Sequence, residues 1–280
     1  MKYYMEDKLS GLHATGSSTK FTEKVVIFIL GGILLTVLPY LHIGVFYHIW
    51  DPNKPPVNRT KCKCDCFDTV FRGPYEWPPS SYKHMYFNAT ANSLKIWFIT
   101  ILAVLAFYEA FRYVFPLIRE KKIRTSMFAL LLSSIYPHYY GWWNMVMYYN
   151  EDFYFQWHHQ LFFSVTEIIS TTIVIHLCNL YNRVYSWKLL VIISINAMHI
   201  IVGGLDLFLM QIYYHEGARF ENVRNLGLLV PDLFHVLVPF FEVQILAERQ
   251  GVSMVHLFYK EEIMMSVLLV ILFSILGRNL

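Results

Sequence analysis

Long apolar blocks alternate with short polar segments along the chain. Seven such blocks can be delimited: 25–46, 93–111, 126–148, 161–181, 189–213, 226–246 and 263–276. About 20 apolar residues in a helix cross the hydrocarbon core of a bilayer, so the last block is short for a span. Because a chain in hydrocarbon must satisfy its own backbone hydrogen bonds, we expect every block to be helical. The pattern predicts an all-α polytopic transmembrane bundle with six spans and a seventh, shorter one.

Basic residues predict the orientation of this bundle. Lys and Arg gather in the N-terminal segment and in the polar segments near 119–124, 183–188 and 249–260, which alternate with less basic ones. Cytoplasmic loops carry an excess of Lys and Arg, so the N-terminus is predicted to be cytosolic. The N-terminal segment, 1–24, lacks the order of a signal peptide. We therefore expect it to be a cytosolic tail that precedes a single membrane bundle, 25–280.

A long loop, 47–92, falls on the extracytosolic side in this topology. It contains two sequons, at Asn58 and Asn88, and both are candidate glycosylation sites. Three cysteines alternate with other residues: Cys62, Cys64 and Cys66. In an oxidising compartment they suggest a disulfide with one thiol left over, and a thiolate metal site is the alternative. The loop predicts passage through the secretory pathway, to the plasma membrane or the endoplasmic reticulum.

The composition agrees with a membrane location. Hydrophobic residues make up 56% of the chain and charged residues only 15%, and the mean hydropathy is +0.39. A soluble domain carries about 25% charged residues. The net charge of +3 is too small to indicate nucleic-acid binding. The expected partners are therefore membrane lipids, a lipid or small-molecule ligand, and copies of this chain or other subunits.

Ionisable side chains inside the predicted spans are the candidate functional residues. Six of them fall in one layer, from the middle of the membrane to its outer face: His138, Glu167, His199, Asp206, Asp232 and His235. Three polar residues lie at the rim of this layer: Asn144, His158 and His159. Charges at membrane depth are costly and usually face a bundle interior or a cavity. His199 and Asp206, seven residues apart, are expected on one helix face.

The layer is open to three chemical interpretations. In the first, His138, His199 and His235 hold a metal ion such as zinc, and carboxylates orient the imidazoles or act as acid and base. Glu167, Asp206 and Asp232 would be those catalytic carboxylates. This interpretation gives a metal-dependent intramembrane hydrolase of a lipid-like substrate. In the second, the layer conducts protons or cations. In the third, it is structural and belongs to a non-catalytic receptor or assembly partner.

The topology and the sequence Ser134-x-x-x-His138 resemble the adiponectin-receptor and alkaline-ceramidase superfamily. That resemblance implies seven helices, a cytosolic N-terminus and a zinc ion held by three histidines. The chain lacks the superfamily's closing His-x-x-x-His pair, and the segment from Asp232 to His235 does not replace it. We therefore do not assign the chain to this superfamily.

Overall fold

The computed structural model describes residues 21–38, 41, 91–150, 157–204, 209, 213–214 and 219–280. Within these ranges the regular structure is helical and no strand occurs; a single isolated bridge joins Ile123 to Asn179. The all-α prediction is therefore confirmed for this part of the chain. The sequons Asn58 and Asn88, the cysteines Cys62, Cys64 and Cys66, and Asp206 lie outside the described residues.

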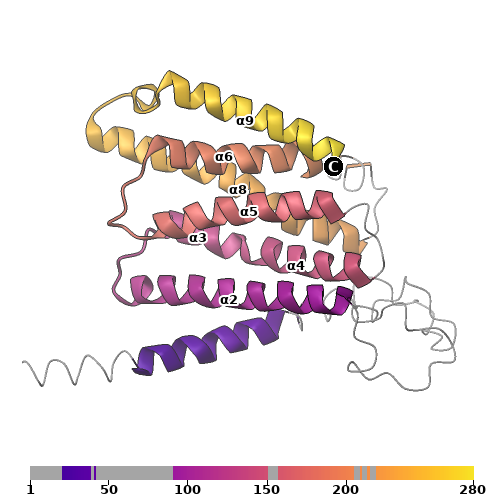
Figure 1. Ribbon diagram of the computed structural model, residues 1–280. Coiled ribbons are helices and arrows are strands. Elements are labelled where there is room, and N and C mark those ends of the chain that lie inside the picture. The colour runs from indigo at the N-terminus through magenta and orange to yellow at the C-terminus, as the bar shows by residue number, and fades with distance from the viewer. Residues whose placement is uncertain are drawn as a thin grey trace, which may run out of the picture.

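The helices lie side by side and cross the molecule between the same two ends (Figure 1). In chain order they are a first helix, Phe21–Leu38, then α2 (Ala91–Arg119), α3 (Thr125–Ser133), α4 (Ile135–Asn150), α5 (Trp157–Cys178), α6 (Ser186–His199), the π-helix η2 (Ile200–Gly204), α8 (Arg219–Gln250), the short 3₁₀-helix η4 (Met254–Leu257) and α9 (Lys260–Asn279). Helix α6 packs against α5, α8 and α9, so it lies inside the bundle.

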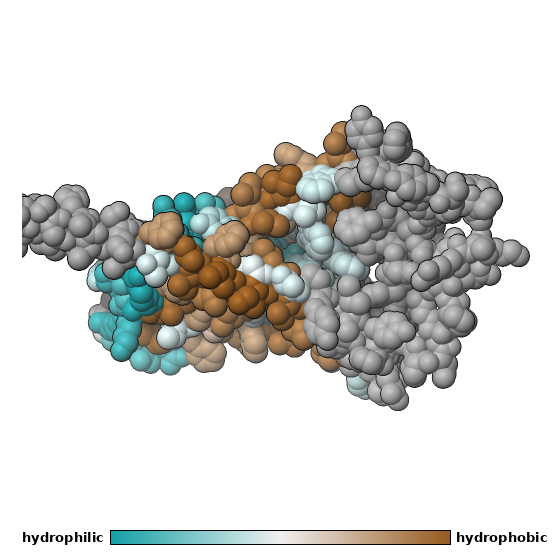
Figure 2. Space-filling model, turned by 90° about the horizontal axis from the view of Figure 1, so that it is seen from below, coloured by the Kyte–Doolittle hydropathy of each residue, from teal (hydrophilic) through white to brown (hydrophobic). Residues whose placement is uncertain are grey.

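Five of these helical segments are long and apolar enough to cross a membrane. They are Phe21–Leu38, Leu94–Arg119, Trp157–Cys178, Ser186–Gly204 and Asn222–Arg249. Figure 2 shows the face formed by the first helix and α2, where apolar side chains form a broad band and hydrophilic ones gather at one end. These features are typical of a membrane protein.

Two of the predicted segments differ from continuous helices. The predicted span 126–148 is interrupted at Ser134, which separates α3 from α4. Pro137 lies in the first turn of α4, where a missing backbone N–H is tolerated. The predicted span 189–213 is an α-helix only as far as His199 and then widens into the π-helix η2. Both irregularities lie beside polar side chains of the predicted layer.

The last segment is longer than its apolar block suggests. Helix α9 contains 20 residues, which corresponds to about 30 Å, because charged residues extend the apolar block 263–276 at both ends. Glu261 and Glu262 occupy its first turn, where negative charge interacts favourably with the helix dipole. Helix α9 is therefore long enough for a span, although it is not among the five segments that are also apolar enough.

A core of buried apolar side chains fills the end of the bundle where α5 ends and α6 begins. Its buried members come from α3, α5, α6 and α8: Met127, Leu130, Val174, Leu177, Cys178, Leu189, Ile192 and Val243. Beyond this core, Arg124, directly before α3, contacts residues of α5 and α8. Its backbone N–H donates to the carbonyl of Cys178 (2.7 Å), and its guanidinium donates to the carbonyl of Leu177 and lies 3.8 Å from Glu242.

Replacing Arg124 with Gln is expected to destabilise the bundle. The Glu242 carboxylate, whose side chain is 13% exposed, would lose its only cationic neighbour among the described residues. Removing one partner of a buried ion pair typically costs about 3 kcal/mol or more. Thermal or denaturant unfolding in detergent measures this loss. The matched control is Lys122→Gln, which breaks an exposed pair with Glu120 in the turn after α2 and should cost much less. Equal effects of the two substitutions would contradict the role of Arg124.

Candidate functional site

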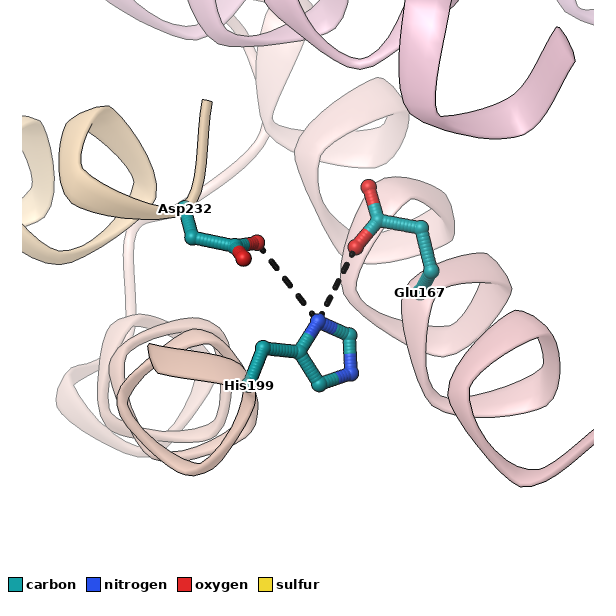
Figure 3. A group of neighbouring side chains, drawn as sticks. All are labelled: Glu167, His199 and Asp232. Carbon is teal, nitrogen blue, oxygen red and sulfur yellow. Dashed lines mark ion pairs between the residues drawn. The ribbon is translucent and has the colours of Figure 1, made fainter. Parts of the chain in front are cut away.

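Three ionisable side chains from three helices meet inside the bundle. Glu167 comes from α5, His199 is the last residue of α6, and Asp232 lies in the middle of α8 (Figure 3). Nδ1 of His199 is 3.6 Å from Oε2 of Glu167 and 3.5 Å from Oδ1 of Asp232. Glu167 and His199 are buried, and Asp232 is half-buried. We call this group the Glu–His–Asp cluster.

The local structure brings α6 and α8 close together at this point. Directly after His199 the backbone widens into the π-helix η2, a feature frequently found at functional sites. Gly204 ends this π-helix, and a Cβ there would lie 2.6 Å from Leu229 of α8. The glycine therefore leaves room for the end of the Leu229 side chain, and Asp232 lies three residues beyond Leu229 on α8.

The contact of the second ring nitrogen, Nε2, indicates the tautomer of His199. Nε2 lies 2.8 Å from the Thr166 hydroxyl, and that hydroxyl donates to the backbone carbonyls of Phe162 and Phe163. A hydroxyl that donates to a carbonyl keeps its oxygen free to accept a hydrogen bond. With the ring proton on Nε2, the hydroxyl accepts from His199 and donates to a carbonyl, so these contacts are all satisfied. In this tautomer the lone pair of Nδ1 faces both carboxylates.

A cation between the three groups would satisfy this arrangement. The two separations from Nδ1 are longer than hydrogen bonds of about 2.7–3.2 Å. They match the edge of a tetrahedron with metal–ligand bonds of 2.0–2.2 Å, which is about 3.3–3.6 Å. The three ligand atoms lie within 4.8 Å of one another. The cluster could therefore hold a metal ion, and a proton on Nδ1 is the simpler alternative.

The cluster opens onto a cavity of about 1470 Å³. The cavity wall is mainly apolar and is supplied by the first helix, α2, α3, α4, α5 and α8. His138, Thr171, Glu167, His199 and Asp232 contribute polar atoms to it. Pockets for drug-sized ligands have about 300–1,000 Å³, so this cavity has room for a larger, mostly apolar molecule.

His138 and His235 use their rings differently from His199. Nδ1 of His235 donates to the carbonyl of Pro231 (2.8 Å), and Nε2 lies 3.1 Å from the Ser134 hydroxyl. Both of its nitrogens are thus occupied, and it joins α8 to the interruption between α3 and α4. Nε2 of His138 lies 2.8 Å from the Thr171 hydroxyl. The structure therefore does not bring the three predicted histidine ligands together; it brings one of them to two carboxylates.

The predicted rim residues divide into two groups. Asn144 and His159 line the cavity, and Asn144 donates to Gln160 across a 3.4 Å contact. The His159 ring packs on Phe163, which in turn packs on His199. His158 is exposed and packs edge-on against Trp157, away from the cavity lining.

Hydroxyl groups that orient the ionisable side chains were not predicted from the sequence. Thr166 holds His199, and Thr171 contacts both His138 and Glu167. Helix α5 is rich in Ser and Thr between residues 164 and 172, and this was the available signal. In histidines that bind a metal, the other ring N–H almost always donates to an oxygen acceptor. Thr166 would be that acceptor for His199.

Apolar side chains separate the cluster from Glu242, the carboxylate on the other side of the bundle core. His235 and Ser134 are the last polar pair on the cavity side, and Ser126 and Glu242 form the next one. Met127 and Leu130 lie between these pairs and are 1% exposed. Along α3, apolar side chains therefore interrupt the polar groups between the cluster and Glu242.

Comparison with known proteins adds the family but no activity. No curated protein and no solved structure matches the chain. A family model described as a family of unknown function (DUF8801) matches residues 24–280, which is nearly the whole sequence. The chain belongs to this family.

Proposed function

We propose that the chain is a metal-dependent intramembrane hydrolase that acts on a lipid-like substrate. The observation that carries this proposal is the position of the His199 lone pair, which faces Glu167 and Asp232 at the spacing of metal ligands. An imidazole and two carboxylates suit zinc, and three protein ligands leave a fourth position open. A zinc ion in such a site lowers the pKa of bound water to about 7, which supplies a nucleophile.

The chain's own residues would hold the metal and place the substrate. His199, Glu167 and Asp232 would be the ligands, and Thr166 would keep the imidazole in the required tautomer. In the reaction, the oxygen of water joins the acyl carbon, the bond to the leaving oxygen or nitrogen breaks, and a proton passes to that leaving atom. The apolar cavity beside the cluster would bind the hydrocarbon part of the substrate.

A hydrolase fits the surroundings of the cluster better than a conductor does. A proton or cation pathway needs a polar route through the protein. The buried Met127 and Leu130, which interrupt the polar groups along α3 on the side of Glu242, speak against such a route. The cluster is instead accessible from the large apolar cavity, as a lipid-binding site would be.

The number of membrane crossings and the orientation of the bundle are also part of this proposal. We add the α3–α4 pair and α9 to the five candidate spans, which gives seven crossings. The turns at 119–125, 178–186 and 250–260 lie at one end of the bundle and carry most of the basic residues near the spans (Figure 1). This end and the N-terminus would face the cytosol. The loop with its sequons and cysteines would then face the lumen, where glycosylation and disulfides form.

Removal of the metal is expected to abolish hydrolysis reversibly. The purified chain would be reconstituted in vesicles of a total lipid extract, and products that contain added water would be followed by mass spectrometry. Chelator treatment should lower product formation to the level of empty vesicles, and added zinc should restore it. Hydrolysis that is unaffected by thorough chelation, with metal removal verified, would contradict the proposal.

A further inference from the structure

The cavity holds one positive side chain as well as the two carboxylates of the cluster. Among the described residues, Glu167, Asp232 and Arg224 are the charged side chains that line it. Arg224 lies on α8, eight residues before Asp232, which is about 12 Å along the helix axis. The cation and the cluster are therefore at two separate places in one cavity.

Most hydrogen-bond donors of Arg224 are unused in the described part of the chain. Its Nε donates to the side-chain oxygen of Asn225 at 3.0 Å, and among the carboxylates whose side chains are described none forms an ion pair with it. A guanidinium has five N–H donors and no acceptor. Tyr136 lies close enough to Arg224 to be affected by its charge, and its buried hydroxyl has no hydrogen-bond partner among the described residues. Arg224 lines the cavity and could bind an anion there, whereas Tyr136 lies behind the cavity wall.

The balance of charges in the cavity also favours an anionic ligand if a metal is bound. A divalent cation would neutralise Glu167 and Asp232, and no other carboxylate side chain among the described lining residues would then compensate the charge of Arg224. Unpaired charges in such surroundings are costly. Without a metal, a protonated His199 and Arg224 would balance the two carboxylates, and no anion would be needed. The metal-loaded cavity therefore favours a ligand with a negative charge.

We propose that the substrate is a lipid with an anionic headgroup, which binds to Arg224. This inference rests on the proposed function. Charge-assisted hydrogen bonds from Arg suit phosphate and carboxylate groups, because its planar fork matches them. The hydrocarbon chain would lie against the apolar wall of the first helix and α2, which includes Leu34, Leu38 and Phe107. The bond to be cleaved would then reach the Glu–His–Asp cluster.

Two single-chain probes without a cleavable ester or amide test this inference by binding alone: hexadecane sulfonate, which is anionic, and hexadecanol, which is neutral. We expect the metal-loaded full chain in neutral detergent to bind the sulfonate about tenfold to a hundredfold more tightly. Arg224→Gln should remove this preference, whereas the control Arg183→Gln, at an exposed position, should keep it. Inorganic phosphate alone should not displace the sulfonate, because it lacks the chain.

Equal affinity for the two probes, or a preference that survives Arg224→Gln, would overturn the inference. Displacement by inorganic phosphate at similar affinity would overturn it as well, because the site would then take a free anion. Metal content is measured in the same preparations. A metal-loaded protein without anion preference refutes the lipid assignment and leaves the proposed function standing. Absence of metal refutes the proposed function, and the effect of Arg224→Gln still decides whether an anion site exists.

Discussion

Replacing Glu167 with Gln is expected to lower lipid hydrolysis by a factor of about 100 or more. The amide keeps the size of the side chain but removes the negative charge that faces His199. A metal ion then loses an anionic ligand. The rate of product formation in reconstituted vesicles measures this effect, and the bound metal per chain should fall with it.

The same substitution is expected to leave the metal-free protein as stable as the native chain, or more stable. Glu167 is buried and lies near a second carboxylate, Asp232, so its charge stabilises the fold only while a cation is present. Functional sites often have this conflict between activity and stability. Glu120→Gln, at an exposed position in the turn after α2, is the control. A large loss of stability with full activity would instead show that Glu167 has a structural role.

His199→Ala and His235→Ala are expected to have different effects, the first on metal binding and the second on stability. His199→Ala removes the nitrogen that faces both carboxylates, so bound metal and hydrolysis should both be lost. His235→Ala should keep the metal but lower the free energy of unfolding. It removes the hydrogen bonds of the ring to the Ser134 hydroxyl and the Pro231 carbonyl, each worth about 0.5–1.5 kcal/mol, and it empties part of a buried position.

Metal analysis and thermal unfolding of the two variants distinguish this account from the three-histidine site expected from the sequence. If His235→Ala lost its metal as completely as His199→Ala, both imidazoles would be ligands. The hydrogen bonds of His235 to Ser134 and Pro231 would then have to break when the metal binds.

The positions of the helices could be read from the sequence because apolar blocks identify segments that avoid water. Their ends could not, because helices continue past the apolar block where charged residues accept helical structure. Helix α8 extends from Arg219 to Gln250, beyond the predicted block 226–246 at both ends. The interruption at Ser134 was also missed, since the hydropathy of 126–148 is continuous there.

The sequence also predicted the members of the cluster but not their partners. Glu167, His199 and Asp232 all belong to the predicted polar layer, and the structure brings them together. His235 lies only three residues from Asp232, yet its ring turns to Ser134. Such a difference depends on how α8 is rotated against α3 and α6, which residue spacing on one helix does not determine.

The most direct test of the account is the metal content of the full chain, purified in detergent without chelator. We predict about one zinc or similar divalent ion per chain, lost in His199→Ala and in the double variant Glu167→Gln, Asp232→Asn. Native protein that remains without metal after incubation with zinc would contradict the account. The Glu–His–Asp cluster would then hold a proton on His199 rather than a metal ion.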